Sequence, residues 1–216
     1  MQRDLISEQT ILEASKRGET AVIVRPGSIV TDAARERAKQ LKIRLTAGPE
    51  AKTPAPAPVS QGPQRKGEVI AIGSDHGGFQ LKELLKTFVT QLGYRVVDLG
   101  TYTEETCDYP DFAYAVARMV SLGDASRGIM IDAVGIASAM VANKVRGIRA
   151  ACCTDEFSAR SSREHNNANV LTLGGRTLGS ELAKSITQAW LETSFGGGRH
   201  QRRVEKISEI ETRHIS

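Results

Sequence analysis

Five short apolar runs, separated by helix-like segments, constrain the fold of this chain more than any other feature. The runs read EVIAIG from residue 68, YRVVDLG from 94, RGIMID from 127, GIRAACC from 147 and NVLTLG from 169. Such nearly continuous apolar runs are typical of parallel strands that are buried on both faces. Helical periodicity predicts helices over residues 80–92, 110–122, 135–145, 155–165 and 181–192. Strands joined by helices of this length form right-handed crossovers, so we predict a doubly wound α/β domain with a five-stranded parallel sheet in residues 68–216.

The first 67 residues follow a different pattern. A short amphipathic helix is predicted over residues 4–17 with Ser7 as its cap, followed by a brief strand over residues 20–24. Thr31 or Asp32 can cap a second helix through about Gln40, and LKIRL then ends the unit as a strand. Residues 47–67 hold five of the seven prolines, which predicts a semi-rigid linker. We therefore expect a small α/β module in residues 1–46, and because so small a core is marginal alone, the module should dock on a partner or on copies of itself.

Composition excludes several classes of protein. No apolar run approaches the roughly 20 residues of a membrane span, and the first residues lack the apolar core of a secretory signal, so we expect a cytoplasmic protein without a membrane partner. The basic surplus lies in residues 1–66, which contain no aromatic residue for stacking on bases, so no nucleic-acid partner is expected. Cys107, Cys152 and Cys153 are predicted to be reduced and mostly buried, and the histidine spacing fits no zinc site, so no metal is expected.

The segment over residues 127–144, RGIMIDAVGIASAMVANK, predicts a buried strand that delivers a loop to a helix N-terminus. Backbone N–H groups without partners and the positive end of the helix dipole favour an anion or a developing oxyanion there. Asp132 lies at the turn, and two interpretations stay open: it caps the helix by accepting backbone N–H bonds, or it acts as a general base. After the first strand of the sheet, Asp75 and His76 stand where a dinucleotide-binding loop needs small residues, so no nucleotide cofactor is expected.

Several motifs taken together resemble the ribose-5-phosphate isomerase B family, which also contains galactose-6-phosphate isomerase subunits. They are GSDHGGFQLK, DLGTYTEETCDYPDFA, ANKVRGIRAACC, SARSSREHNNANVLTLGGR and GGRHQRRV, and the resemblance covers residues 67–212. It implies a Rossmann-like domain and a homodimer whose active sites are shared between subunits, with any higher oligomer left open. It also implies isomerisation of a phosphorylated sugar between aldose and ketose, without metal or cofactor.

The resemblance also assigns roles to individual residues. His165 matches the residue that opens the sugar ring, Asn166 holds the sugar hydroxyls, Asp75 contacts the ring end of the substrate and Tyr109 lines the pocket. The remaining matches, for the phosphate or the substrate, are His76, Arg176, Arg199 and Arg203. Two of these, Arg199 and Arg203, are four residues apart, so they share one helical face and can grip a phosphate with paired guanidinium groups.

The chain departs from the family in the loop that should carry the catalytic base. The family usually has Cys-Gly-Thr-Gly-x-Gly, with the cysteine as base, whereas this chain has Asp132, Ala133, Val134, Gly135, Ile136 and Ala137. Ser138 stands where another branch has a glutamate base. One hypothesis is an isomerase of ribose 5-phosphate and ribulose 5-phosphate that uses a cis-enediolate and Asp132 as base. The alternative is a non-catalytic or redirected protein that binds sugar phosphates or serves assembly.

The N-terminal module has a resemblance of its own. The patterns I-x-E-x-x-I-x-x-A, V-x-P-G-S-I-V-T-D-A-A-R-E-R-A and I-R-L, within residues 6–45, resemble a module of bacterial microcompartment proteins, including ethanolamine-utilisation components. The resemblance implies that residues 1–46 associate with shell or cargo proteins and that the chain resides inside a microcompartment.

Overall fold

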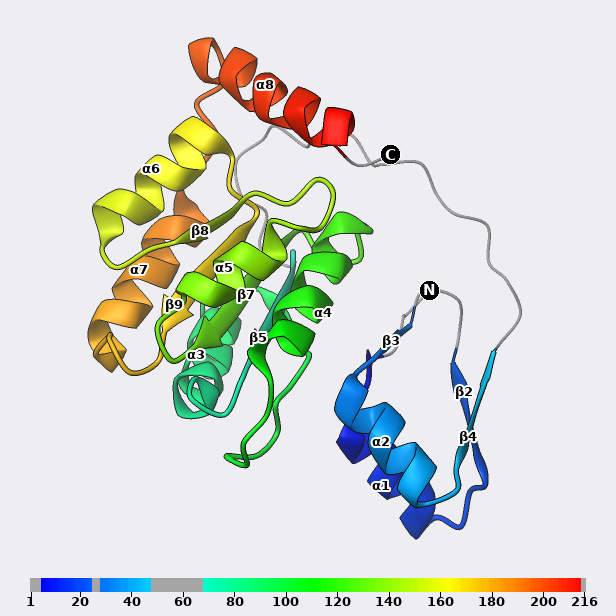
Figure 1. Cartoon of the computed structure of the whole chain (residues 1–216). Coiled ribbons are helices and arrows are strands. Elements are labelled where there is room, and N and C mark those ends of the chain that lie inside the picture. Colours follow the sequence, from blue (N-terminus) through cyan, green and yellow to red (C-terminus); the bar gives the residue numbers. More distant parts are fainter. Residues whose placement is uncertain (1–4, 25–27, 48–67, 215–216) are drawn as a thin grey trace. The chain divides into compact units, whose positions relative to one another are not determined.

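The computed structural model describes residues 5–24, 28–47 and 68–214. The chain divides into two compact units, Met1–Ala55 and Pro56–Ser216 (Figure 1). The linker predicted over residues 47–67 lies outside the described residues except for Ala47, which ends a strand. No helix in the described ranges is both long and apolar enough to cross a membrane.

The first unit repeats a strand–helix–strand pattern. Its elements are β1 (Leu5–Ile6), α1 (Glu8–Lys16), β2 (Ala21–Val24), β3 (Ile29–Val30), α2 (Asp32–Gln40) and β4 (Arg44–Ala47). β1 pairs with β3 and β2 with β4, both in parallel. As predicted, Ser7 caps α1; of the two residues proposed to cap α2, Thr31 does so, accepting a hydrogen bond from the Ala34 N–H (3.1 Å).

Two predictions for this unit were wrong at the edges of elements. Leu5 and Ile6 form β1 instead of opening the first helix, because the cap residue Ser7 has an extended backbone and the helix begins only at Glu8. The final strand starts at Arg44 and not at Leu41, because Leu41 is the C-cap of α2.

The second unit contains the predicted parallel sheet, in the order β6-β5-β7-β9-β8. Its strands are β5 (Val69–Ser74), β6 (Arg95–Asp98), β7 (Arg127–Asp132), β8 (Ala150–Cys152) and β9 (Val170–Gly174). The helices are α3 (Phe79–Gln91), α4 (Tyr109–Ser121), α5 (Ile136–Ala142), α6 (Glu156–Asn166), α7 (Ser180–Glu192) and α8 (Arg199–His214). Every predicted strand and helix of this unit is present, although β6, α5 and β8 are shorter than predicted.

Helices cover both faces of the sheet (Figure 1). On one face, Ile129, Leu171 and Trp190 belong to a buried core shared by β5, β7 and β9 with α3, α6 and α7. On the other face pack α4 and α5, and there Gly128 allows α4 a close approach, since a Cβ on it would lie 2.5 Å from Val116 Cγ1. The doubly wound, Rossmann-like prediction is confirmed.

This topology decides where polar residues lie. The carboxyl ends of the parallel strands share one edge of the sheet, and the loops after β5, β7 and β9 are hydrogen-bonded there: Asp75 N–H to Ile131 O (3.1 Å) and Gly175 N–H to Asp132 O (2.7 Å). α6 leaves that edge and runs back, so its last residues lie near the amino ends of the strands, where Gly128 N–H donates to Asn169 O (2.9 Å). Side chains at the start of α6 therefore lie about one strand length away from side chains at its end.

Candidate functional site

Two clusters contain the residues predicted to form a site. The carboxyl-edge cluster comprises Asp75, His76, Tyr109, Asp132, Ala133, Val134, Gly135, Ile136, Ala137 and Arg176, all on loops or helix starts that follow β5, β6, β7 and β9. The amino-edge cluster comprises His165, Asn166, Arg199 and Arg203, at the end of α6 and the first turns of α8. α8 packs against α6, and Gly196 N–H donates to Glu164 O (2.9 Å).

Asp132 is buried at the end of β7, with 5% of its surface exposed. Its Oδ1 accepts hydrogen bonds from the backbone N–H groups of Val134 (2.7 Å) and Gly135. Its Oδ2 accepts from the Ser138 N–H (3.0 Å) and from the Ser138 hydroxyl. A carboxylate offers about four acceptor positions, and here four donors occupy them. This geometry corresponds to the capping interpretation. The sequence analysis noted Ser138 only as the position where another branch has a glutamate, and it did not predict that Ser138 binds Asp132.

The loop after Asp132 keeps one indispensable glycine. Gly135 has a φ of 88°, and a Cβ on it would lie 2.9 Å from the carbonyl carbon of Leu173, so only glycine fits without strain. Because the Val134 and Gly135 N–H groups both turn toward Asp132, they are not directed at a substrate oxygen. Ile136 and Ala137 open α5, and within residues 68–214 no acceptor takes their N–H groups.

Asp75 lies beside Asp132 but is less engaged. It is 6% exposed, and its Oδ1 accepts a hydrogen bond from the Gly78 N–H (3.0 Å). Burial raises the pKa of Asp75 and the negative charge of Asp132 adds to this, although backbone N–H groups and His76 oppose the effect. A carboxylate whose pKa is moved toward neutrality is suited to accept and return a proton.

Backbone contacts hold the neighbouring imidazole of His76. Its Nδ1 lies 3.3 Å from both the N–H and the carbonyl oxygen of Cys107, which stands two residues before the start of α4 at Tyr109. Burial raises the pKa of the Cys107 thiol, so it is protonated at neutral pH. All three cysteines are free as predicted, but only Cys153 is fully buried, because Cys107 and Cys152 lie in half-covered positions of the carboxyl edge.

His165 of the amino-edge cluster stacks on a second imidazole, that of His200. The rings of His165 and His200 have centroids 4.3 Å apart and planes 11° from parallel, and the Ser161 hydroxyl lies 3.2 Å from His165 Nδ1. Arg199 and Arg203 lie on the first turns of one helix, α8, as their spacing predicted, and both side chains are exposed. The sequence reasoning did not single out His200, although its position next to Arg199 was a usable signal.

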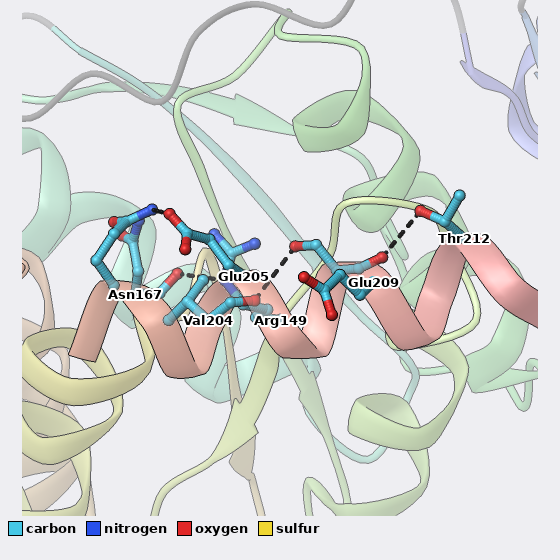
Figure 2. A pocket seen from close by; sticks show the side chains of 8 residues that line it. Arg149, Asn167, Val204, Glu205, Glu209 and Thr212 are labelled. Atoms are coloured by element: carbon cyan, nitrogen blue, oxygen red, sulfur yellow. Dashed lines mark hydrogen bonds between the residues drawn. The ribbon is translucent and has the colours of Figure 1, made fainter. Parts of the chain in front are cut away.

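A groove lies between α8 and the residues that follow α6, with a volume of about 440 Å³ (Figure 2). Its lining includes Arg149, Gln201 and Glu205 and none of the predicted site residues. Arg149 Nε donates to the carbonyl oxygens of Asn166 (3.1 Å) and Asn167 (3.0 Å). The arginine therefore stabilises the C-terminus of α6, next to His165.

The two clusters lie at opposite edges of the sheet within one chain. β7 has six residues, and at about 3.3 Å per residue the sheet separates the edges by roughly 17–20 Å. One small sugar phosphate cannot touch Asp132 and His165 of the same chain at once. Within the described residues no group of three or more His, Cys, Asp and Glu side chains could hold a metal ion.

A doubly wound sheet with two buried carboxylates at its carboxyl edge is the framework of an α/β enzyme that moves protons on a small substrate. The chain belongs to the family described as Ribose/Galactose Isomerase, whose model matches residues 70–207. This relation places it among sugar-phosphate isomerases.

The second unit matches named relatives over nearly the whole of their length. Ribose-5-phosphate isomerase B of Escherichia coli (strain K12) is 46% identical, over 67% of this chain and 97% of its own. Galactose-6-phosphate isomerase subunit LacA of Streptococcus equi subsp. zooepidemicus is 45% identical, over 65% of this chain and 98% of its own. The solved structure of Clostridium thermocellum ribose-5-phosphate isomerase B is 51% identical and matches with a TM-score of 0.67. The match covers 68% of this chain and 99% of that one. The family match does not include the first unit.

Proposed function

We propose that this chain interconverts ribose 5-phosphate and ribulose 5-phosphate through a cis-enediolate. The observation that carries the proposal is the buried carboxylate pair Asp75 and Asp132 at the carboxyl edge, in a domain that matches ribose-5-phosphate isomerases over almost their full length. The reaction needs a group that takes a proton from C2 and returns it to C1. A carboxylate can do this in place of the family's cysteine, because a carboxylate is also the base in other isomerases that form an enediolate.

Asp75 is the better placed of the two carboxylates for this proton. Asp132 must release one of its four hydrogen bonds before it can accept a proton, whereas Asp75 accepts fewer bonds and has a raised pKa. In this assignment Asp132 anchors the loop and Asp75 carries the proton. Asp132 as the base stays the alternative, and the Asn variants described below separate the two.

At the other end of the substrate, His165 gives a proton to the ring oxygen while the proton of the anomeric hydroxyl leaves to a carboxylate. An imidazole is suited to this because it titrates near neutral pH. Arg199 and Arg203 hold the phosphate with guanidinium groups, and Asn166 holds sugar hydroxyls. In the same proposal His76, Tyr109 and Arg176 contact the substrate at the carboxyl edge.

Because one chain separates these groups, we assign the complete site to two chains in a homodimer. An isologous pair places the amino-edge cluster of one chain against the carboxyl-edge cluster of its partner. The apolar side chains beside the loop support this surface as the contact: Val134, Ile136 and Met140 are 45%, 51% and 63% exposed. Burial of such a patch by a second copy removes apolar area from water.

The direct test is an assay of ribose 5-phosphate isomerisation by the purified full chain, coupled to detection of ribulose 5-phosphate. We expect turnover by the native protein and a loss of kcat by about 10² or more in Asp75→Asn, because a general base typically contributes 10²–10⁴-fold. Asp132→Cys, which restores the family's usual residue, should retain or raise turnover. If Asp132→Asn loses turnover while Asp75→Asn keeps it, the base is Asp132. Absence of turnover in the native protein contradicts the proposal.

A second function, binding of sugar phosphates without turnover, is favoured by one observation. The Val134 and Gly135 N–H groups, which the loop could offer to an enediolate oxygen, are bound to Asp132. This function predicts phosphate binding in the native protein together with gain of turnover in Asp132→Cys.

For the first unit we propose association with microcompartment proteins, which rests on its sequence resemblance. A fluorescent protein fused to the full chain should collect in the compartments of a compartment-forming cell. Ile11→Asp places a charge in the fully buried core of the unit and should make the fusion diffuse while isomerase activity persists. A native fusion that is already diffuse contradicts this role.

A further inference from the structure

His200 stacks on the imidazole to which ring opening is assigned. The two rings are nearly parallel, at 11°, with centroids 4.3 Å apart. His165 is also restrained at one edge, because the Ser161 hydroxyl lies 3.2 Å from its Nδ1. The stack restrains the face of the ring and Ser161 restrains its rotation, so Nε2 is the nitrogen left for a substrate.

The hydrogen bonding of His200 fixes its protonation state. Arg199 Nε lies 3.4 Å from His200 Nε2, and since a guanidinium can only donate, this nitrogen accepts and the ring is neutral. Burial and the charges of His165, Arg199 and Arg203 lower the pKa of His200, and only Glu164 opposes them. Between the arginines of α8 and His165 of α6, the ring remains uncharged at neutral pH.

The attachment of α8 alone does not account for a flat ring in place of an aliphatic side chain at this position. His200 Nδ1 is buried and has no hydrogen-bond partner within the described part of the chain. A buried polar atom without a partner costs free energy that an aliphatic side chain would not. Val204, one turn further along α8, is 7% exposed and already gives this helix a buried apolar side chain. A flat ring at this position therefore needs an explanation beyond the attachment of α8.

We propose that His200 is a positioning residue for ring opening: its neutral ring holds the plane of the His165 imidazole, next to the arginines that grip the phosphate. The proposal rests on the proposed function. In ring opening, the O1–H proton passes to a carboxylate and its electron pair forms the C1=O1 bond. The C1–O4 bond breaks and O4 takes a proton from His165, so the proton count is unchanged. Enolisation of the open chain does not need this step.

The test separates ring opening from enolisation. Ribulose 5-phosphate has no ring, because its C5 oxygen carries the phosphate. Its exchange of C1 hydrogen for deuterium in D2O, followed by NMR, therefore reports enolisation alone. Conversion of ribose 5-phosphate to ribulose 5-phosphate reports both steps.

In His200→Ala we expect conversion to fall about 10- to 100-fold, since small misplacement of a catalytic group costs up to 10². The exchange rate should stay within about threefold of native. His200→Phe keeps a flat ring for stacking and should recover most of the conversion. Gln201→Ala, a change to the neighbouring side chain on α8, is the matched control and should alter neither rate.

Parallel loss of conversion and exchange in His200→Ala would overturn the proposal, because it would mean that the residue only supports α8 and the phosphate grip. Unchanged conversion in His200→Ala would also overturn it. If the native protein performs neither reaction, the proposed function fails and this role fails with it, an outcome distinguishable from the other two.

Discussion

Replacing Asp132 by Asn tests whether this carboxylate is an anchor of the loop. The side chain accepts from Val134 N–H and Gly135 N–H through one oxygen and from Ser138 N–H and hydroxyl through the other. An amide keeps one acceptor oxygen and turns an NH2 group toward two donors. Two hydrogen bonds to a charged group are then lost, at about 1.5–3 kcal/mol each, or about 3 kcal/mol in total at the least.

For a domain of this size, about 3 kcal/mol lowers Tm by at least about 6 °C. The assay is thermal unfolding of native and Asp132→Asn proteins at equal protein concentration, since association also affects Tm. Asp155→Asn is the matched control, because Asp155 caps α6 in the same way, accepting from the Ser158 N–H (2.7 Å), but its carboxylate is exposed to water. We expect the control to lose no more than about 1 kcal/mol. If Asp132→Asn is no less stable than Asp155→Asn, the anchoring argument is refuted.

Three further predictions concern the second unit. Lys82 is 0% exposed and donates to both oxygens of Asp98 and to a backbone carbonyl, so Lys82→Met should lower the free energy of unfolding by about 3 kcal/mol in urea titrations; an unchanged midpoint would contradict this. Gly128→Ala should cost about 1–3 kcal/mol by overpacking against Val116, and Val116→Ala in the same chain should recover part of it, whereas simple additivity of the two losses would argue against the contact. Burial raises the pKa of Asp75, so its contribution to the free energy of unfolding is fully present below the ordinary carboxyl pKa and is lost as pH rises through the pKa of the folded state. Asp75→Asn should therefore be more stable than the native protein at pH 7, and the difference should vanish near about pH 4. A native protein that is more stable than Asp75→Asn at pH 7 would contradict this direction.

The sheet of the second unit could be predicted because its signals are local and agree with one another. Apolar runs such as RGIMID are buried on both faces, and the helices between them follow the helical period. The first unit was harder at its start, because Leu5 and Ile6 fit a helical apolar stripe as well as a strand. The extended backbone at Ser7 decided the matter.

The residues of the site could be named from the sequence, but their arrangement could not. His165 and Asp132 lie at opposite edges of the sheet because α6 returns along the strands, a consequence of topology that motifs do not contain. Whether Asp132 caps or acts as base depends on where its four acceptor positions point. The left-handed backbone of Gly135 turns the loop so that its N–H groups meet the carboxylate. A glycine in the sequence allows that conformation but does not predict it.

In the proposed dimer, carboxylates of one chain and the histidine and arginines of its partner form one isomerase site. The most direct measurement mixes two inactive variants, Asp75→Asn and Arg203→Ala, by co-expression with different tags and purification through both tags. Each is deficient alone, but a mixed dimer contains one site with neither substitution, so random pairing gives native sites in about a quarter of the total. With a shared site, ribose 5-phosphate turnover should return to near that fraction in the unselected mixture and to about half in purified mixed dimers. Turnover that stays at the level of the separate variants would contradict the shared site.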